Sequence, residues 1–164
     1  MIIFALHTNW YVKGIQMQLS AKYKDKLPKV KEPLGSYERF SYANGIGKIS
    51  GQFPVDKYSN LVCGSINVNE IEKAKEASML VALNIMAQIE NIKKVLEVDT
   101  LLHIDCYVQS SMNDENLVKV IDEISLTLQD AFVDSAKHSR SLVIVSDLPL
   151  NAMMEVVTTF SYKI

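Results

Sequence analysis

Apolar residues recur every three or four positions over two long stretches of the chain, residues 70–96 and 111–132. This spacing predicts two amphipathic helices, each with one face turned toward a core. Asn69 is the predicted N-cap of the first helix, and Glu72 stands three residues later in capping-box position. The predicted inward positions are Ala74, Ala77, Val81, Ile85, Ile89, Ile92 and Leu96 in the first helix, and Leu117, Val120, Ile121, Ile124, Leu128 and Ala131 or Phe132 in the second.

A hairpin is predicted before the first helix. Residues 37–55 contain two β-like runs around Ala43-Asn44-Gly45. Asn-Gly between such runs is the strongest short hairpin pattern, because both residues tolerate positive φ. Gly51, inside the second run, indicates a bulge or a close backbone approach, since it has no side chain to pack.

Three further strands follow. Residues 101–110 alternate between apolar and polar, which is typical of a half-buried strand. The pattern predicts Leu102, Ile104, Cys106 and Val108 on one face and His103, Asp105 and Tyr107 on the other. Residues 141–146 and 153–162 are the last two predicted strands, joined by a short loop.

The order of elements is hairpin, helix, strand, helix, strand, strand, which predicts an α+β fold. Two helices can cover one face of a mixed sheet. The other face must meet solvent or a second chain. The segment "MMEVVTTF" is apolar on both faces, which favours a subunit interface, although a central strand of a monomer has the same pattern.

Residues 1–34 form a predicted N-terminal extension, and residues 35–164 form the main domain. A short helix is expected around Gln16–Lys22, and Pro28 and Pro33 oppose regular structure between them. The first dozen residues are expected to be loosely held.

Composition narrows the classes of function. The chain has 164 residues, enough for one domain with a real core, and a formal net charge of −2. That charge argues against a general nucleic-acid or membrane-surface binder. No run approaches the roughly 18 apolar residues of a membrane span, and "MIIFAL" is too short for a secretory signal. The separated Cys63 and Cys106 indicate reduced thiols in a cytoplasmic type of compartment.

Arg140 and Glu155 are the first candidate site residues. Arg140 is one of two arginines and precedes an apolar run; its planar fork matches a carboxylate or phosphate, yet an exposed strand-edge arginine gives the same pattern. Glu155 stands among Met and Val residues. If its side chain is buried with them, the carboxylate lowers stability unless it is paired or hydrogen-bonded. The alternative is that Glu155 lies on an edge strand and points to water. The short loop between their strands could bring the two side chains together.

Other titratable residues have weaker support. His103, Asp105 and Tyr107 share a strand face and could be catalytic or metal-binding, but a solvated sheet face is the commoner arrangement. The three histidines lack zinc-type spacing, so neither a metal nor a cofactor is predicted. Cys106 falls on an apolar strand face and is expected to pack as a small hydrophobe.

Several motifs together resemble the RidA/YjgF family, also labelled L-PSP endoribonuclease, over about residues 34–162. They are "SGQFPV", the long helix, "YVQS" closing a strand, "SRSLVIVSDLPLNAMMEV", and Tyr37 thirteen residues before Ser50. The chain's length and "LPLNA" are similar to the longer branch of that family. The resemblance implies a chorismate-mutase-like fold and a homotrimer with a barrel-like interior and clefts between subunits.

The resemblance also implies a reaction and its residues. The deaminase branch hydrolyses enamines or imines of amino-acid metabolism, such as 2-iminobutanoate and 2-iminopropanoate, to 2-oxo acids and ammonia. By position, Arg140 matches the arginine that grips the substrate carboxylate, and Glu155 the acid that positions water. Tyr37 matches the cleft tyrosine, and Gly51 the glycine whose backbone lies against the ligand.

Two positions depart from the deaminase pattern. Leu142 stands where that branch has a cysteine, so only its backbone N–H is available to a substrate, and Asp122 stands where it has an asparagine. By position, both are still predicted to lie at the substrate-binding site. An ionised Asp122 would repel a carboxylate ligand. These departures favour the alternative of a non-catalytic trimer that binds small molecules such as 2-oxo acids. The endoribonuclease activity of the family label has little support, because the sequence lacks a basic patch interleaved with aromatics and a histidine pair.

Overall fold

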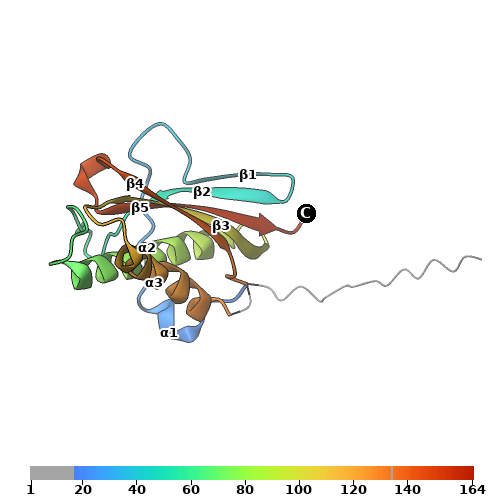
Figure 1. Cartoon of the computed structure of the whole chain (residues 1–164). Coiled ribbons are helices and arrows are strands. Elements are labelled where there is room, and N and C mark those ends of the chain that lie inside the picture. Colours follow the sequence, from blue (N-terminus) through green and yellow to red (C-terminus); the bar gives the residue numbers. More distant parts are fainter. Residues whose placement is uncertain (1–16, 134) are drawn as a thin grey trace, which may run out of the picture.

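The structure, a computed structural model, describes residues 17–133 and 135–164. One mixed sheet has the strand order β1-β2-β5-β3-β4, in which β3 and β4 run parallel and the other neighbours antiparallel. Helices α2 and α3 lie on one face of this sheet (Figure 1), which is the predicted α+β fold. The strands are β1 (Phe40–Ala43), β2 (Ile46–Gln52), β3 (Val98–Gln109), β4 (Ser139–Val145) and β5 (Met154–Tyr162); the helices are α1 (Ala21–Lys24), α2 (Ile71–Ile92), α3 (Glu115–Ala131) and the 3-10 turn η1 (Pro149–Asn151).

The predicted hairpin is β1–β2, and its two-residue turn is Asn44-Gly45. Both residues have positive φ, 50° and 81°, which is the backbone twist that a tight hairpin requires. Strand β2 then pairs with β5, and its register shifts between Ile49 and Gln52. The bulge predicted at Gly51 is therefore confirmed.

The core lies between the sheet and the two long helices. The inward residues predicted for α3 are all buried, Ala131 and Phe132 both included. From β5, Val156 and Phe160 point toward the helices and are fully buried. Gly47 makes room for the Phe160 ring, since a Cβ there would lie 2.6 Å from two ring carbons. The sheet's other face has no helix over it among the described residues.

One inward position predicted for β3 is wrong. Leu102 is 37% exposed, whereas its neighbour Leu101 is fully buried. The register with β5 shifts between Leu101 and His103. An extra residue in a strand reverses which side chains face the core on one side of that residue. Alternation counted backward from Ile104 therefore places Leu102 in the core, whereas the residue in the core is Leu101.

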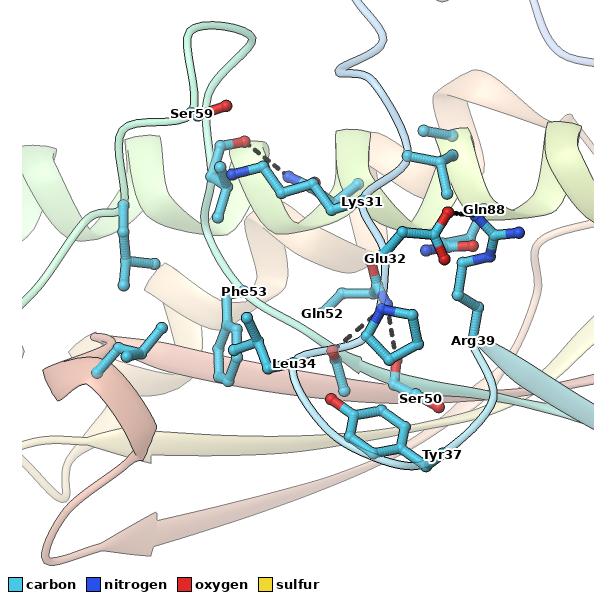
Figure 2. Close-up of a pocket in the computed structure, with 18 residues that line it drawn as sticks. Lys31, Glu32, Leu34, Tyr37, Arg39, Ser50, Gln52, Phe53, Ser59 and Gln88 are labelled. Atoms are coloured by element: carbon cyan, nitrogen blue, oxygen red, sulfur yellow. Dashed lines mark hydrogen bonds and ion pairs between the residues drawn. The ribbon is translucent and has the colours of Figure 1, made fainter.

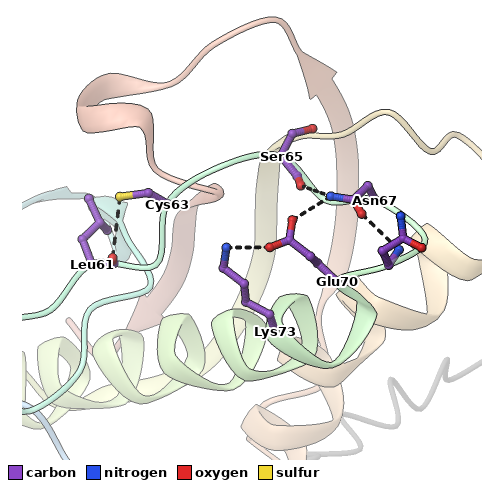
Figure 3. A network of polar contacts seen from close by, with 7 residues as sticks. Leu61, Cys63, Ser65, Asn67, Glu70 and Lys73 are labelled. Carbon is purple, nitrogen blue, oxygen red and sulfur yellow. Dashed lines mark hydrogen bonds and ion pairs between the residues drawn. The ribbon is translucent and has the colours of Figure 1, made fainter.

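The predicted start and end of α2 also need correction. The helix begins at Ile71, its N-cap is Glu70, and no side-chain bond caps it. The Asn67 side chain instead accepts from the Asn69 N–H at 3.0 Å and donates to Glu70 at 2.7 Å (Figure 3). Asn69 is thus held in a turn by Asn67 and does not act as the cap. The helix ends at Ile92, one turn before the predicted Leu96.

The N-terminal segment that the structure describes packs on the main domain. Its helix spans Ala21–Lys24, later than the predicted Gln16–Lys22, and lies beside α3 (Figure 1). Tyr23 is buried and donates to Asp130 of α3 at 2.6 Å. The prediction that the first dozen residues are loosely held concerns residues outside the described part, and the boundary at residue 34 stays a prediction. None of the described helices combines the length and the apolar character needed to cross a membrane.

Candidate functional site

Arg140 leaves strand β4 on the side of the sheet that the helices cover. Its Nη2 donates to Asp122 Oδ1 of α3 at 2.8 Å, and its Nη1 donates to Ser125 Oγ at 3.3 Å. The Arg140 side chain is 20% exposed and that of Asp122 is 46% exposed. The guanidinium is therefore held by α3 but still reaches the surface.

A series of hydrogen bonds through Ser125 and His138 fixes the position of Arg140. His138 Nδ1 lies 2.6 Å from the Ala136 carbonyl, and His138 Nε2 lies 3.0 Å from Ser125 Oγ. Because a carbonyl only accepts, Nδ1 carries the ring proton, and Nε2 accepts from the Ser125 hydroxyl. Burial first, and then the charge of Arg140, lower the pKa of His138. A neutral His138 leaves the Ser125 oxygen free to accept from the arginine.

Leu142 stands two residues after Arg140 on the same face of β4 and packs against the hydrophobic core. Its side chain has no acid, base or nucleophile to contribute. We call Arg140, Asp122, Ser125, His138 and Leu142 the arginine cluster.

Glu155 belongs to a second group, on the opposite face of the sheet. Its neighbours on β5, Met154 and Val156, are fully buried beneath the helices, so Glu155 points to the uncovered face. Its Oε1 fills the place that a Cβ of Gly51 would take, and its Cγ would be 2.8 Å from that Cβ. Partial burial raises the pKa of the Glu155 carboxyl. A carboxyl with a raised pKa is better matched to proton transfer near neutral pH.

Tyr37 stands in the segment that leads into β1 and is 54% exposed. The Ser50 hydroxyl donates to the Glu38 carbonyl at 2.6 Å, which ties this segment to the end of β2. Tyr37 and Gly51 line the same cavity (Figure 2). We call Tyr37, Gly51 and Glu155 the glutamate cluster.

The two clusters do not meet within one chain. Strand β3 lies between β4 and β5, although the loop that joins these two strands is short. Arg140 and Glu155 also leave the sheet on opposite faces. The idea that the short loop brings them together is therefore wrong for a single chain.

Three of the remaining candidates, His103, Asp105 and Tyr107, lie on the uncovered face of β3, where Tyr107 is paired directly with Glu155 of β5. His103 Nε2 lies 3.1 Å from Asp105 Oδ1, and His103 Nδ1 lies 2.6 Å from Ser139 Oγ, on the uncovered face. Residues 17–133 and 135–164 contain no group of three or more acidic, histidine or cysteine side chains suited to a metal ion. Cys106 is fully buried as predicted, and burial raises its pKa to about 12, which disfavours the thiolate.

Ser125 and His138 were not predicted as site residues, although the sequence shows how each is spaced from a predicted site residue. Ser125 follows Asp122 by three residues, so the two share a face of α3. His138 precedes Arg140 by two residues. These two spacings identify site residues only once α3 is known to lie against β4.

The fold can be compared with solved structures. No known family model and no curated protein matches the sequence. A Shewanella oneidensis MR-1 protein called a "putative endoribonuclease" is 24% identical, with a TM-score of 0.75, covering 83% of this chain and 91% of its own. RidA from an Antarctic Psychrobacter is 19% identical, with a TM-score of 0.58 and coverage of 89% and 98%. Escherichia coli TdcF with bound serine is 17% identical, with a TM-score of 0.59 and the same coverage.

These likenesses define a class of fold. The chain is an α+β protein in which helices cover one face of a mixed five-stranded sheet. More particularly, this is the fold of the RidA/YjgF proteins, as the sequence resemblance implied.

Proposed function

We propose that this chain is a RidA/YjgF-type hydrolase that converts small imines or enamines bearing a carboxylate into 2-oxo acids and ammonia. The observation that carries the proposal is the division of the predicted site into two complementary clusters on opposite faces of the sheet. One offers an arginine fork for a carboxylate, and the other a half-buried acid with a raised pKa. Neither cluster is complete alone.

A homotrimer would join the two clusters. The Arg140 of one subunit would then meet the Tyr37, Gly51 and Glu155 of the next in a cleft between them. The uncovered sheet face leaves room for such packing, since a sheet normally buries at least one face and often both. TdcF, which has this fold, was solved with serine, a ligand that carries a carboxylate.

The reaction needs no covalent nucleophile, because an imine carbon is already electrophilic. Arg140 would hold the substrate carboxylate and so fix the position of that carbon, and orientation of this kind can supply several kcal/mol. Water adds its oxygen to the imine carbon while Glu155 accepts one water proton and passes it to the nitrogen, which gives a carbinolamine. Transfer of the hydroxyl proton to that nitrogen, again through Glu155, breaks the C–N bond, releases ammonia and leaves a C=O bond. Leu142 takes no part in these steps.

The proposal is tested by generating 2-aminoacrylate in the assay and measuring the release of 2-oxo acid. We expect the wild-type chain to accelerate release well beyond the spontaneous rate. The Arg140→Ala variant, purified in the same way, should not, which excludes a contaminant as the source. A wild-type chain that gives no acceleration would refute the hydrolase.

The second candidate function is a non-catalytic trimer that binds 2-oxo acids. The Arg140–Asp122 ion pair favours it, because Asp122 already occupies part of the fork that a ligand carboxylate would use. In that case a bound 2-oxo acid would contact Arg140, and imines would not turn over.

Asparagine at position 122 should strengthen carboxylate binding under either function. Asp122→Asn removes a negative charge beside Arg140 and keeps the size of the side chain. For 2-oxobutanoate we expect the dissociation constant to fall about five- to tenfold, because a partly solvated charge interaction is worth roughly 1 kcal/mol. Titration calorimetry measures it. The control is Glu123→Gln, the same loss of charge on α3 next to Lys75. An unchanged constant in Asp122→Asn would mean that the ion pair does not compete with the ligand.

A further inference from the structure

Tyr107 stands beside Glu155 on the uncovered face of the sheet. The antiparallel register places the two residues directly opposite each other, Tyr107 on β3 and Glu155 on β5. Side chains in such a cross-strand pair leave the same face, with their Cβ atoms about 4.5–5.5 Å apart. The partner of Tyr107 on β4 is Val143, which carries no polar group in its side chain. A molecule that reacts at Glu155 therefore lies within reach of the Tyr107 phenol.

The Glu155 carboxyl leans away from Tyr107. Its Oε1 takes the place that a Cβ of Gly51 would fill, so the carboxyl is turned toward β2, on the opposite side of β5 from Tyr107. The Tyr107 side chain is half-buried, and its hydroxyl takes part in no hydrogen bond within residues 17–133 and 135–164. The acid and the phenol therefore do not engage each other, and a small molecule over this part of the sheet can contact both.

The polar residues on either side of Tyr107 along β3 already have partners. Asp105 Oδ1 lies 3.1 Å from His103 Nε2, and Gln109 Nε2 donates to the Ala152 carbonyl at 2.8 Å. A phenol without a partner can both donate and accept a hydrogen bond. Tyr107 is thus the polar neighbour of Glu155 on this strand that is free to bind a ligand.

The proposed reaction leaves one polar atom of the substrate without a partner. The carboxylate binds the arginine fork, and Glu155 serves the attacking water, so the nitrogen remains. Negative charge develops on this nitrogen as water adds to the carbon, and a donor aimed at developing charge lowers the barrier. The in-plane lone pair of the imine nitrogen can accept from a phenol. The electron pair released from the C=N bond then takes the proton that Glu155 passes on.

We propose that Tyr107 is a further catalytic residue, whose hydroxyl donates a hydrogen bond to the imine nitrogen while Glu155 activates water. The inference rests on the proposed function, because it requires the reacting carbon to lie beside Glu155. The phenol keeps its own proton, so the proton transfers through Glu155 are unchanged.

Tyr107→Phe removes the hydroxyl and keeps the ring. We expect the rate of 2-oxo acid release from 2-aminoacrylate to fall about ten- to a hundredfold. This loss is smaller than that of a typical oxyanion donor, because the proton from Glu155 neutralises part of the charge on the nitrogen.

Two ligands separate the hydroxyl from the ring. In 2-oxobutanoate a carbonyl oxygen stands in for the imine nitrogen, whereas butanoate has the carboxylate alone. Calorimetry on the full chain should show that Tyr107→Phe raises the dissociation constant of 2-oxobutanoate about three- to tenfold, the usual effect of one lost hydrogen bond. The constant of butanoate should stay the same. The control is Tyr42→Phe, on the edge strand β1 outside both clusters, which should change neither the rate nor the two constants.

The two proposals fail separately. If Tyr107→Phe hydrolyses and binds like the wild type, Tyr107 is not catalytic and the proposed function stands. Equal weakening of both ligands would also overturn the role of the hydroxyl, since the ring alone would then explain the loss. If the wild type gives no hydrolysis, the proposed function fails; selective weakening of 2-oxobutanoate would still place the Tyr107 hydroxyl against the ligand. A wild type that binds neither ligand would overturn both proposals.

Discussion

Two inactive variants of this protein should regain activity when their chains are mixed. Arg140→Ala removes the carboxylate anchor, and Glu155→Gln removes the acid while keeping its shape. Each should lower 2-aminoacrylate hydrolysis at least about a hundredfold, because loss of the anchor frees the substrate and loss of the acid leaves no proton acceptor. If each site takes Arg140 from one subunit and Glu155 from the next, a mixed trimer rebuilds some intact sites.

The expected recovery follows from counting. In randomly mixed trimers at equal concentration, a site is intact only when its arginine comes from a Glu155→Gln chain and its acid from an Arg140→Ala chain. Both conditions hold for about one site in four. The measurement is the rate of 2-oxo acid release after the two chains are unfolded and refolded together, relative to wild type treated in the same way.

The controls isolate the origin of the activity. Each variant refolded alone should stay inactive. A mixture of either variant with a chain that carries both substitutions should stay inactive as well. Activity that fails to return in well-formed mixed trimers would place Arg140 and Glu155 in separate sites. The geometry within one chain makes that outcome informative, since the two side chains leave opposite faces of the sheet.

Much of this fold follows from local patterns. The helix periodicity gave the buried face of α3 residue by residue, and Asn44-Gly45 gave the hairpin. The errors arose where a local pattern has more than one solution. Asn67 competes with Asn69 for the turn before α2, and a register shift reverses the faces of β3 before His103.

The candidate site depends on contacts that the sequence does not encode locally. The pairing of Arg140 with Asp122 requires α3 to lie over β4, and the separation of Arg140 from Glu155 requires β3 to insert between two strands that are consecutive in the chain.

Alanine in place of Gly51 should damage both activity and stability through a single contact. Gly51 lies directly under Glu155, and a Cβ there would lie 2.5 Å from Glu155 Cδ, so the acid must move. A displacement of about 1 Å at a catalytic group can cost roughly a hundredfold in rate. Overpacking of this kind typically costs about 1–3 kcal/mol of unfolding free energy.

A double-mutant cycle assigns these losses to Glu155. Urea unfolding should show that Gly51→Ala costs much less in a Glu155→Ala background, because the alanine there leaves room for the new Cβ. Gly47→Ala is the matched control: its Cβ would meet Phe160 on the helix side, so its cost should be the same in both backgrounds. If Gly51→Ala is equally costly with and without Glu155, then the glycine is needed by the β2 bulge itself. In that case the position of the acid would have to be set by the neighbouring subunit.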